Sequence, residues 1–302
     1  RLPIYNGNFA SANLTIGRGG SPINGGSAID VVLSTAGASI LLVYVDSTQG
    51  WVATNDDSSS IKGEAFVTAT GGTETTSGNF KIHTFTSPGT FTVCSVASVS
   101  ANNEVSYMVV AGGGGGGAGC NAHSAGGGGG AGGYRENKSA VDTYTASPIE
   151  GAPNISVTAT SFPITVGAGG AGAPGQSARG TSGSASIFST TTSAGGGGAG
   201  SQDGGVQLGL NGGSGGGGGQ ADNPSPDGSY SCGVNKGTGN TPPVSPAQGN
   251  PGGNGTVGPG GAADGGGGGG GAGGAGGNSP GQPTGGAGGT GTTSSINGTP
   301  TA

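Results

Sequence analysis

Short runs of alternating apolar and polar residues fill the first sixty positions of the chain, separated by clusters of Gly, Ser, Asn and Pro. Alternation of β-branched and aromatic residues with polar ones is typical of half-buried strands, and the intervening clusters favour turns. No stretch combines helical i, i+3, i+4 spacing with a capping residue. The pattern therefore predicts an essentially helix-free β module over residues 1–60, with strands at Asn13–Ile16, Ile29–Leu33, Ile40–Asp46 and Trp51–Thr54.

A second group of strands is predicted over residues 61–111. It begins with Ala65–Ala69. Alternation over Phe80–Phe85, the turn Ser87-Pro88-Gly89 and the second alternating run Thr90–Val93 together predict a β-hairpin, because Pro pre-sets φ and Gly accepts positive φ. Val105–Val110 is the last strong strand, and it leads directly into a glycine stretch.

After residue 111 the alternation gives way to glycine-rich segments of similar length. Two long loops, 134–166 and 220–251, interrupt them and hold most of the aromatic and charged residues of this half. Phe162–Val166 and Ser186–Phe188 are apolar islands that stand shortly before glycine runs, as Val105–Val110 does, which is the nearest approach to an internal repeat. The glycine-rich segments are 112–119, 126–133, 167–175, 195–200, 212–219, 252–261, 265–277 and 285–291.

The glycine content limits how this half can fold. It holds 66 of the 79 glycines of the chain, about one residue in three, which excludes an ordinary side-chain core. Collagen needs Gly at every third position, and runs such as Gly112–Gly117 break that rule. Two alternatives remain. One is a flexible linker; the other is a bundle of polyglycine II helices, which have three residues per turn and backbone groups that must bond to neighbouring helices.

The even lengths of the segments favour the bundle. A linker has no physical reason to divide its glycine into segments near eight residues long, whereas eight residues rising ~3.1 Å each span ~25 Å, a suitable depth for a domain. The bundle would need many hydrogen bonds, each contributing about 0.5–1.5 kcal/mol net, to offset the backbone entropy that glycine loses. We therefore expect an all-β N-terminal part followed by a polyglycine II bundle over residues 112–302.

Charge and hydropathy argue against two classes of partner. The net charge is −6 with a pI near 4.6, and only 7% of the residues are charged. Nucleic-acid binding usually needs a basic patch, which the sequence lacks. No apolar run reaches the ~18–20 residues of a membrane span. We expect neither nucleic-acid binding nor membrane insertion.

Residue types that usually carry catalysis are sparse. His83 and His123 have no partners at metal-ligand or triad spacing. The run Asn55–Ser58 lacks the pattern of a calcium loop and is interpreted as a turn. Matches to GxGxxG within glycine runs carry no weight, because no helix is predicted to follow them. We expect no enzyme activity, no cofactor and no metal, and we interpret Trp51 as a core or interface residue.

The three cysteines show no spacing typical of a metal or redox motif. Cys94 lies among the apolar residues Val93 and Val96 and is expected to be a small buried residue. Cys120 and Cys232 lie in loops near glycine runs and could form a disulfide.

Side chains suited to binding gather in the two long loops, where exposed aromatic and charged residues favour contact with a partner. The alternative is that these loops cap the bundle or pack against another subunit. The candidates for receptor or subunit contact are Tyr134, Arg135, Glu136, Lys138, Tyr144, Asp222, Asp227, Tyr230 and Lys236.

Several stretches follow one another in an order found in a known group of proteins. They are Phe80–Phe85 with Ser87–Val93, Val105–Gly114, Ala131–Arg135, Phe162–Gly170 and Ser186–Phe188. This order resembles the glycine-rich domain of bacteriophage structural proteins, most closely tail-fibre and adhesin proteins of marine and cyanobacterial phages. Leu42–Trp51 resembles a small β-module of similar fibres. Residues 200–302 match in composition alone. The resemblance implies a virion-surface or extracellular protein whose apical loops bind a host receptor or glycan, or else a structural spacer in a fibre or other extracellular filament.

The sequence thus predicts a non-catalytic structural fibre protein of the tail-fibre or adhesin type. Each N-terminal module has about 50 residues, a size that often needs oligomerisation, so a homo-oligomer such as a trimer or filament is expected. One alternative is an extracellular filament subunit of cellular origin, which would polymerise alone into indefinite fibres. Another is a glycine-rich ice-binding protein, which would need a flat regular face and show thermal hysteresis.

Overall fold

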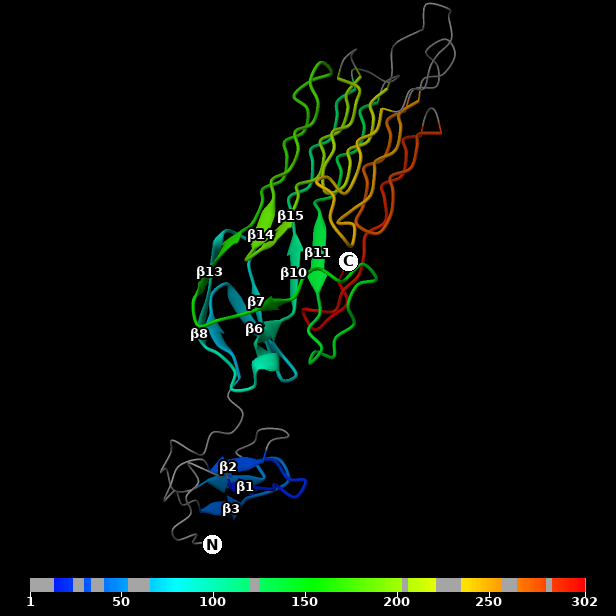
Figure 1. The fold of residues 1–302 in the computed structure, drawn as a ribbon. Coiled ribbons are helices and arrows are strands. Elements are labelled where there is room, and N and C mark those ends of the chain that lie inside the picture. The colour runs from blue at the N-terminus through cyan, green and yellow to red at the C-terminus, as the bar shows by residue number, and fades with distance from the viewer. Residues whose placement is uncertain are drawn as a thin grey trace, which may run out of the picture. The chain divides into compact units, whose positions relative to one another are not determined.

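The computed structural model describes residues 14–23, 30–33, 41–53, 66–119, 125–202, 206–220, 235–256, 265–280 and 284–301. Within these ranges the chain forms short strands in several small sheets, and the helical structure there is a single 3₁₀ turn at Ser100–Asn103 (Figure 1). The prediction of an all-β protein is therefore confirmed. The chain divides into two compact units, Arg1–Thr68 with Cys94–Asn103 and Ala69–Val93 with Glu104–Ala302. The expected division at residues 60 and 111 stays a prediction.

The first unit contains two antiparallel pairs of strands. β1 (Leu14–Ile16) pairs with β2 (Val31–Leu33), and β3 (Leu42–Tyr44) pairs with β4 (Trp51–Ala53), so each strand lies within a range predicted from the alternation. Trp51 is half-buried and meets the ring of Tyr44 edge-on at 5.4 Å. Its backbone N–H donates to Pro22 O at 2.8 Å. Trp51 therefore packs within its own unit.

The largest sheet has five strands, in the order β15 (Thr191–Ser193), β14 (Ser186–Phe188), β13 (Ser161–Thr165), β8 (Gly89–Ser95) and β5 (Thr68–Thr70). Phe91, Phe162 and Phe188 meet on it with ring centroids 6.1–6.3 Å apart, and Tyr107 lies 5.7 Å from Phe188. Between β8 and β13 the chain forms two smaller antiparallel pairs. These are β9 (Glu104–Val105) with β12 (Ile155–Ser156) and β10 (Tyr107–Val110) with β11 (Tyr134–Asn137). This aromatic cluster is the apolar core of the second unit.

The hairpin predicted between Phe80–Phe85 and Thr90–Val93 is wrong. β7 (Phe80–Thr84) instead pairs with β6 (Thr73–Ser77) across the two-residue turn Gly78-Asn79, and β8 pairs with β13. Gly78 has φ of +57°, the backbone geometry that matches the twist of a tight hairpin. The shorter Gly-Asn connection therefore determines the local pairing, and the Pro-Gly turn carries the chain onward to another sheet.

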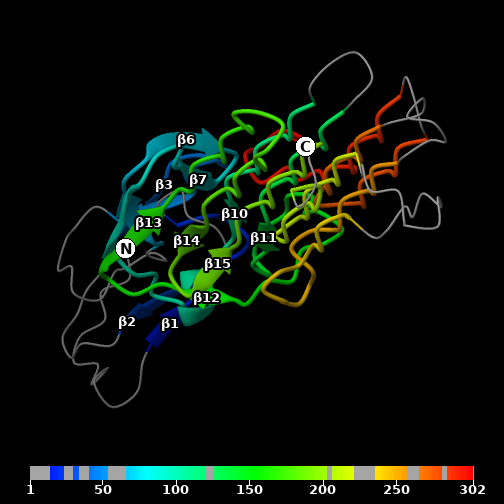
Figure 2. The ribbon, with the colours of Figure 1, turned by 90° about the horizontal axis from the view of Figure 1, so that it is seen from above.

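Glycine-rich segments continue from the strands as extended chain and run alongside one another (Figures 1 and 2). The segment after β10 lies antiparallel to the one before β11, and the amides at 111, 114 and 117 donate to the carbonyls at 133, 130 and 127. The amides at 127, 130 and 133 in turn donate to the carbonyls at 200, 197 and 194. Each set of bonds recurs at every third residue.

Other amides of the same segment bond in a different direction. Gly128 and Ala131 donate to Gly267 and Gly270, in a segment that runs parallel to the one before β11. The stretch 265–277, predicted as one segment, is two, because the chain reverses near residue 272 and Gly268 N donates to Gly277 O. Each segment is thus held by several neighbours that are distant in sequence.

The close approach of these segments explains why they are made of glycine. A Cβ atom placed on Gly130 would lie 2.3 Å from Ser214 O, and one placed on Gly217 would lie 2.1 Å from Gly267 O. Both distances are far below van der Waals contact, and the obstructing atoms belong to the backbone of a neighbouring segment. Any side chain at these positions would push the segments apart and break their hydrogen bonds.

Candidate functional site

Three of the predicted contact residues form strand β11 and are buried. Tyr134, Arg135 and Glu136 are 7%, 5% and 0% exposed, so the expectation that they lie on an exposed loop is wrong. The reason is register. The glycine segment after β10 pairs antiparallel with the one before β11, residue 111 opposite 133 and residue 114 opposite 130. The strand pairing Val110↔Tyr134 continues the same register without a shift. Backbone pairing therefore carries these polar residues into the interior.

Glu136 is the centre of a buried hydrogen-bond cluster. Its carboxylate accepts from Tyr134 Oη and from Ser294 Oγ, both at 2.6 Å, and from the Ser147 backbone N–H at 3.0 Å. Burial alone would raise the pKa of Glu136, but the hydrogen bonds from Ser147, Ser294 and Tyr134 outweigh it and lower the pKa below its ordinary value. Burial also raises the pKa of Tyr134, as does its hydrogen bond to Glu136. The cluster ties the C-terminal segment to β11.

Arg135 fixes a second loop. Its guanidinium donates from Nη2 to Ser245 O at 3.0 Å and from Nη1 to Pro246 O. Burial lowers the pKa of Arg135. The adjacent side chain Gln248 is 1% exposed and accepts from Ala194 N through Oε1 at 2.8 Å. Arg135 and Gln248 thus join the loop 240–248 to the sheet, and their polar groups bond to the chain itself.

Lys138 and Tyr144 lie beside this cluster and are half-buried. Lys138 Nζ is 5.5 Å from the centroid of the Tyr144 ring, a cation–π contact. Tyr144 Oη donates to Asn137 O at 3.5 Å, and burial together with the charge of Glu136 raises the pKa of Tyr144. Of the predicted contact residues in the first loop, these two retain accessible surface.

The second predicted loop is described only in part. Asp222, Asp227 and Tyr230 lie outside the described residues, as do both members of the Cys120–Cys232 pair. Lys236 is half-buried and follows Asn235, whose Nδ2 donates to Gly219 O at 2.7 Å. The N–H of Gln220 donates to Ala125 O, at the opposite end of segment 125–133 from β11. Lys236 is therefore separated from Lys138 and Tyr144 by the length of the glycine segments.

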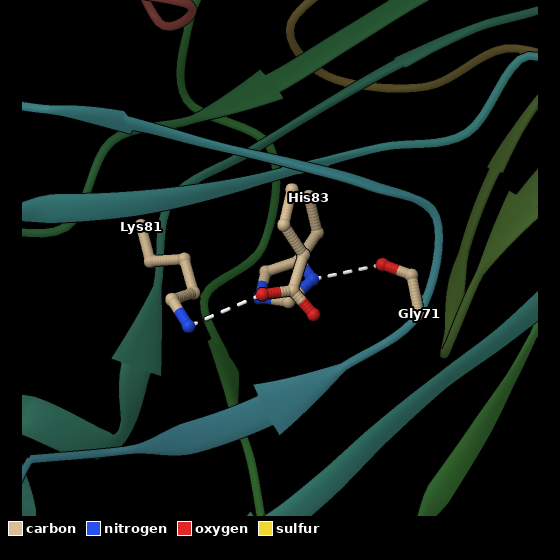
Figure 3. Close-up of polar contacts among 4 residues, drawn as sticks. Gly71, Lys81 and His83 are labelled. Atoms are coloured by element: carbon tan, nitrogen blue, oxygen red, sulfur yellow. Dashed lines mark hydrogen bonds and ion pairs between the residues drawn. The ribbon is translucent and has the colours of Figure 1, made fainter.

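His83 contacts a backbone carbonyl and an aromatic ring. Its Nδ1 lies 2.8 Å from Gly71 O, and its ring meets Phe91 edge-on at 5.1 Å; nearby, Lys81 pairs with Glu74 at 3.1 Å (Figure 3).

Within the described ranges, no three His, Cys, Asp or Glu residues are grouped to hold a metal ion. His123 and Asn55–Ser58 fall outside those ranges. A search of the same ranges finds no helix with the length and apolarity of a membrane span.

Cys94 is exposed, so the expectation of a buried thiol is wrong. In β8 the buried residues are Phe91 and Val93, two positions apart. Strand alternation then turns Cys94 to the opposite face, away from the aromatic cluster.

A groove of about 760 Å³ runs along the glycine segments and was not predicted from the sequence. Its lining comes from three segments, within 126–132, 266–272 and 285–292, together with Met108 and Val110 of β10, Tyr134 of β11 and Thr301. Met108 and Val110 are 41% and 49% exposed, because alternation in β10 buries Tyr107 and Val109 instead. The groove escapes sequence analysis because most of its surface is backbone. The exposed apolar face of β10 is the one side-chain feature that could have indicated it.

Comparison with known proteins identifies one family. A family model described as a glycine-rich domain matches residues 84–302, well over half of the chain. No curated protein and no solved structure shows significant similarity to the sequence.

Proposed function

The chain belongs to the family of glycine-rich domains, and on that premise we propose that it is a non-catalytic structural protein built on a polyglycine II bundle. The observation that carries the proposal is the period of the hydrogen bonds. Amides three residues apart, such as Gly127 and Gly130, donate to one neighbouring segment, whereas Gly128 and Ala131 donate to another. A helix with three residues per turn presents its amides in this way.

Such a bundle is suited to a mechanical role. Each backbone hydrogen bond contributes about 0.5–1.5 kcal/mol net, and neighbouring segments cross-link one another from several sides. The buried polar side chains serve the same end. Glu136 binds the C-terminal segment through Ser294, and Arg135 binds the carbonyls of Ser245 and Pro246. These groups hold the chain together, which favours a scaffold over a reactive site.

Amide hydrogen exchange tests the scaffold. In a bundle, the bonded amides of Gly128 and Gly130 exchange slowly, whereas Gly169 and Gly172, which donate to no group among the described residues, exchange quickly. Gly130→Ala should abolish the protection, since its Cβ would lie 2.3 Å from Ser214 O, and Gly288→Ala should keep it, since nothing lies within 4 Å of its Cβ. Uniformly fast exchange of all glycine amides in the unmodified chain would show a flexible linker and refute the bundle.

We further propose a tail-fibre or adhesin role, in which one end of the bundle contacts a host surface. Within the glycine-rich half, described residues that flank three of the undescribed stretches lie at the ends of glycine segments that are remote from β11. Gly117 N donates to Gly127 O, Gly219 N to Gln207 O and Thr256 N to Gly265 O. By sequence, the stretch between Gln220 and Asn235 carries Asp222, Asp227 and Tyr230. Acidic and aromatic side chains of this kind suit a receptor or glycan.

Binding to bacterial surfaces tests this role. The labelled chain is applied to a panel of bacterial cells and to immobilised surface glycans, and the double variant Asp222→Ala/Tyr230→Ala is compared with Lys138→Ala/Tyr144→Phe. We expect the first pair to weaken binding at least tenfold and the second, beside β11, to leave it unchanged. Equal binding by the two variants, or no binding to any member of the panel, would contradict the adhesin role while leaving the scaffold in place.

A further inference from the structure

Backbone groups along the groove lack hydrogen-bond partners among the described residues, as they would beside a missing segment of the bundle. Gly266 and Gly269 are among the residues that line the groove and are three residues apart. Their carbonyls accept from Gly286 and Gly289, yet their N–H groups donate to no acceptor in the part of the chain that the structure describes. Gly129 and Gly132 line a wall, and neither the N–H nor the C=O of either one bonds to a described group. Backbone groups this close to the interior ordinarily find partners.

The segment 167–173, here called the outer segment, has the complementary property. Gly170 and Ala173 donate inward to Gly113 and Gly116, whereas Gly169 and Gly172 are exposed, with backbone N–H and C=O groups that bond to no described residue. Gly169 and Gly172 are again three residues apart. A Cβ placed on either one would meet a single atom, at 3.7 and 3.8 Å, so this face is open.

On the basis of these two surfaces, and of the polyglycine II bundle proposed above, we propose that the outer segment of a second copy of this chain docks in the groove. Its carbonyls would accept from Gly266 and Gly269, since both rows repeat every three residues, ~9.3 Å along the helix. Only glycine and alanine occur in the outer segment, so no bulky side chain keeps the backbones apart. The occupant is thus an extended, glycine-rich backbone.

Edge protection supports the same conclusion. Exposed rows of unpaired N–H and C=O groups template pairing with another chain, and proteins that avoid such pairing place charged residues on the exposed edge. Neither the outer segment nor the groove wall 285–291 contains a charged residue. At one end of the groove, Met108 and Val110 are exposed, and Val166 directly precedes the outer segment. An outer segment that runs antiparallel to the three groove segments would bring these apolar residues together.

The docking would join unlike surfaces of two copies. In one copy the outer segment bonds to 113–116 and 181–184, whereas the groove is formed by 126–132, 266–272 and 285–292. An interface between different patches repeats from copy to copy, and it gives a ring if it closes or a filament if it does not. The proposed contact is therefore a means by which the scaffold extends.

Disulfide cross-linking between copies tests the pairing. The three native cysteines are replaced by Ser, and Gly169→Cys and Gly291→Cys are made as separate proteins; both sites leave room for a Cβ. On mixing under oxidising conditions, we expect the mixed dimer as the main product, with little dimer from either protein alone. Predominant Gly291→Cys homodimer would indicate groove-to-groove pairing, and absence of any dimer would indicate no contact; either result overturns the proposal.

Sedimentation velocity on the full chain gives a second test. Gly288 lines the groove and has open space at its Cβ, so Gly288→Leu should fill the groove without disturbing the segments. Leu208→Arg, at an apolar residue that is 51% exposed and does not line the groove, is the control. We expect self-association to weaken at least tenfold for Gly288→Leu and to be retained for Leu208→Arg. Unchanged association of Gly288→Leu overturns the docking.

Glycine amide exchange distinguishes failure of the docking between copies from failure of the polyglycine II bundle. A monomeric chain with slow exchange at Gly128 and Gly130 would retain the bundle and refute only the docking. A monomeric chain with fast exchange at both would refute the bundle as well.

Discussion

Glu136 shows how an ionised side chain can be kept inside a protein with a small apolar core. Removing a carboxylate from water is costly unless several donors replace the solvent. Here a tyrosine hydroxyl, a serine hydroxyl and a backbone N–H do so, and one of these donors, the Ser294 hydroxyl, comes from a residue far away in sequence. Because the same bonds lower the pKa of Glu136, the ionised form stabilises the folded state.

Replacement of this carboxylate should therefore change both stability and its pH dependence. The folded-state pKa of Glu136 lies below the ordinary value of 4.5. Its contribution is complete above pH 4.5 and is lost as the pH falls through the folded-state pKa. We expect Glu136→Gln to lower the free energy of unfolding at pH 7 by about 1–3 kcal/mol, and to reduce the loss of stability on acidification. Urea unfolding between pH 3 and pH 7 measures both.

Glu150→Gln is the matched control, because Glu150 is exposed. It should leave the free energy of unfolding within about 0.5 kcal/mol of the original at pH 7. If Glu136→Gln showed the same stability and the same acid sensitivity as Glu150→Gln, the buried cluster would not stabilise the fold.

At the scale of elements, alternation predicted the strands that carry apolar residues and missed the polar ones. β3, β4, β13 and β14 coincide with β-branched or aromatic runs. β6 reads TETTS and β15 reads TTS, and neither has an apolar face. These strands form because a tight turn or a neighbouring strand supplies the backbone partner, a tertiary effect that a local pattern does not contain.

Less of the candidate site than of the strands could be predicted, because its burial also depends on tertiary partners that a local pattern does not contain. The aromatic and charged character of residues 134–136 was plain, but polar residues are ordinarily assigned to the surface. Their burial follows from the register of the glycine segments, which depends on which segments are neighbours. Most segment lengths can be read from the sequence, apart from the reversal near residue 272. The choice between the antiparallel partner of Gly130 and the parallel partner of Gly128 cannot. The groove follows from that choice.

At the scale of the whole molecule, the interior differs chemically from that of an ordinary domain. Among the residues that the structure describes, the largest fully buried side chains are Gln248, Glu136, Ser139, Ser193, Ser201 and Ser214, and none of these six is apolar. Apolar burial in the second unit is concentrated around the cluster of Phe91, Phe162 and Phe188. Much of the surface that unfolding exposes is therefore the polar backbone of glycine.

This composition predicts an unusually small heat-capacity change on unfolding. Newly exposed apolar surface raises the heat capacity and polar surface lowers it, and ordinary proteins show about 12–15 cal/mol/K per residue. Because the glycine segments expose mainly N–H and C=O groups, we expect this chain to fall below about half that value per residue. Differential scanning calorimetry measures it, with an all-β protein of similar length and an apolar core as the reference. A value in the ordinary range would mean that burial of apolar surface, not backbone hydrogen bonding between glycine segments, stabilises the fold.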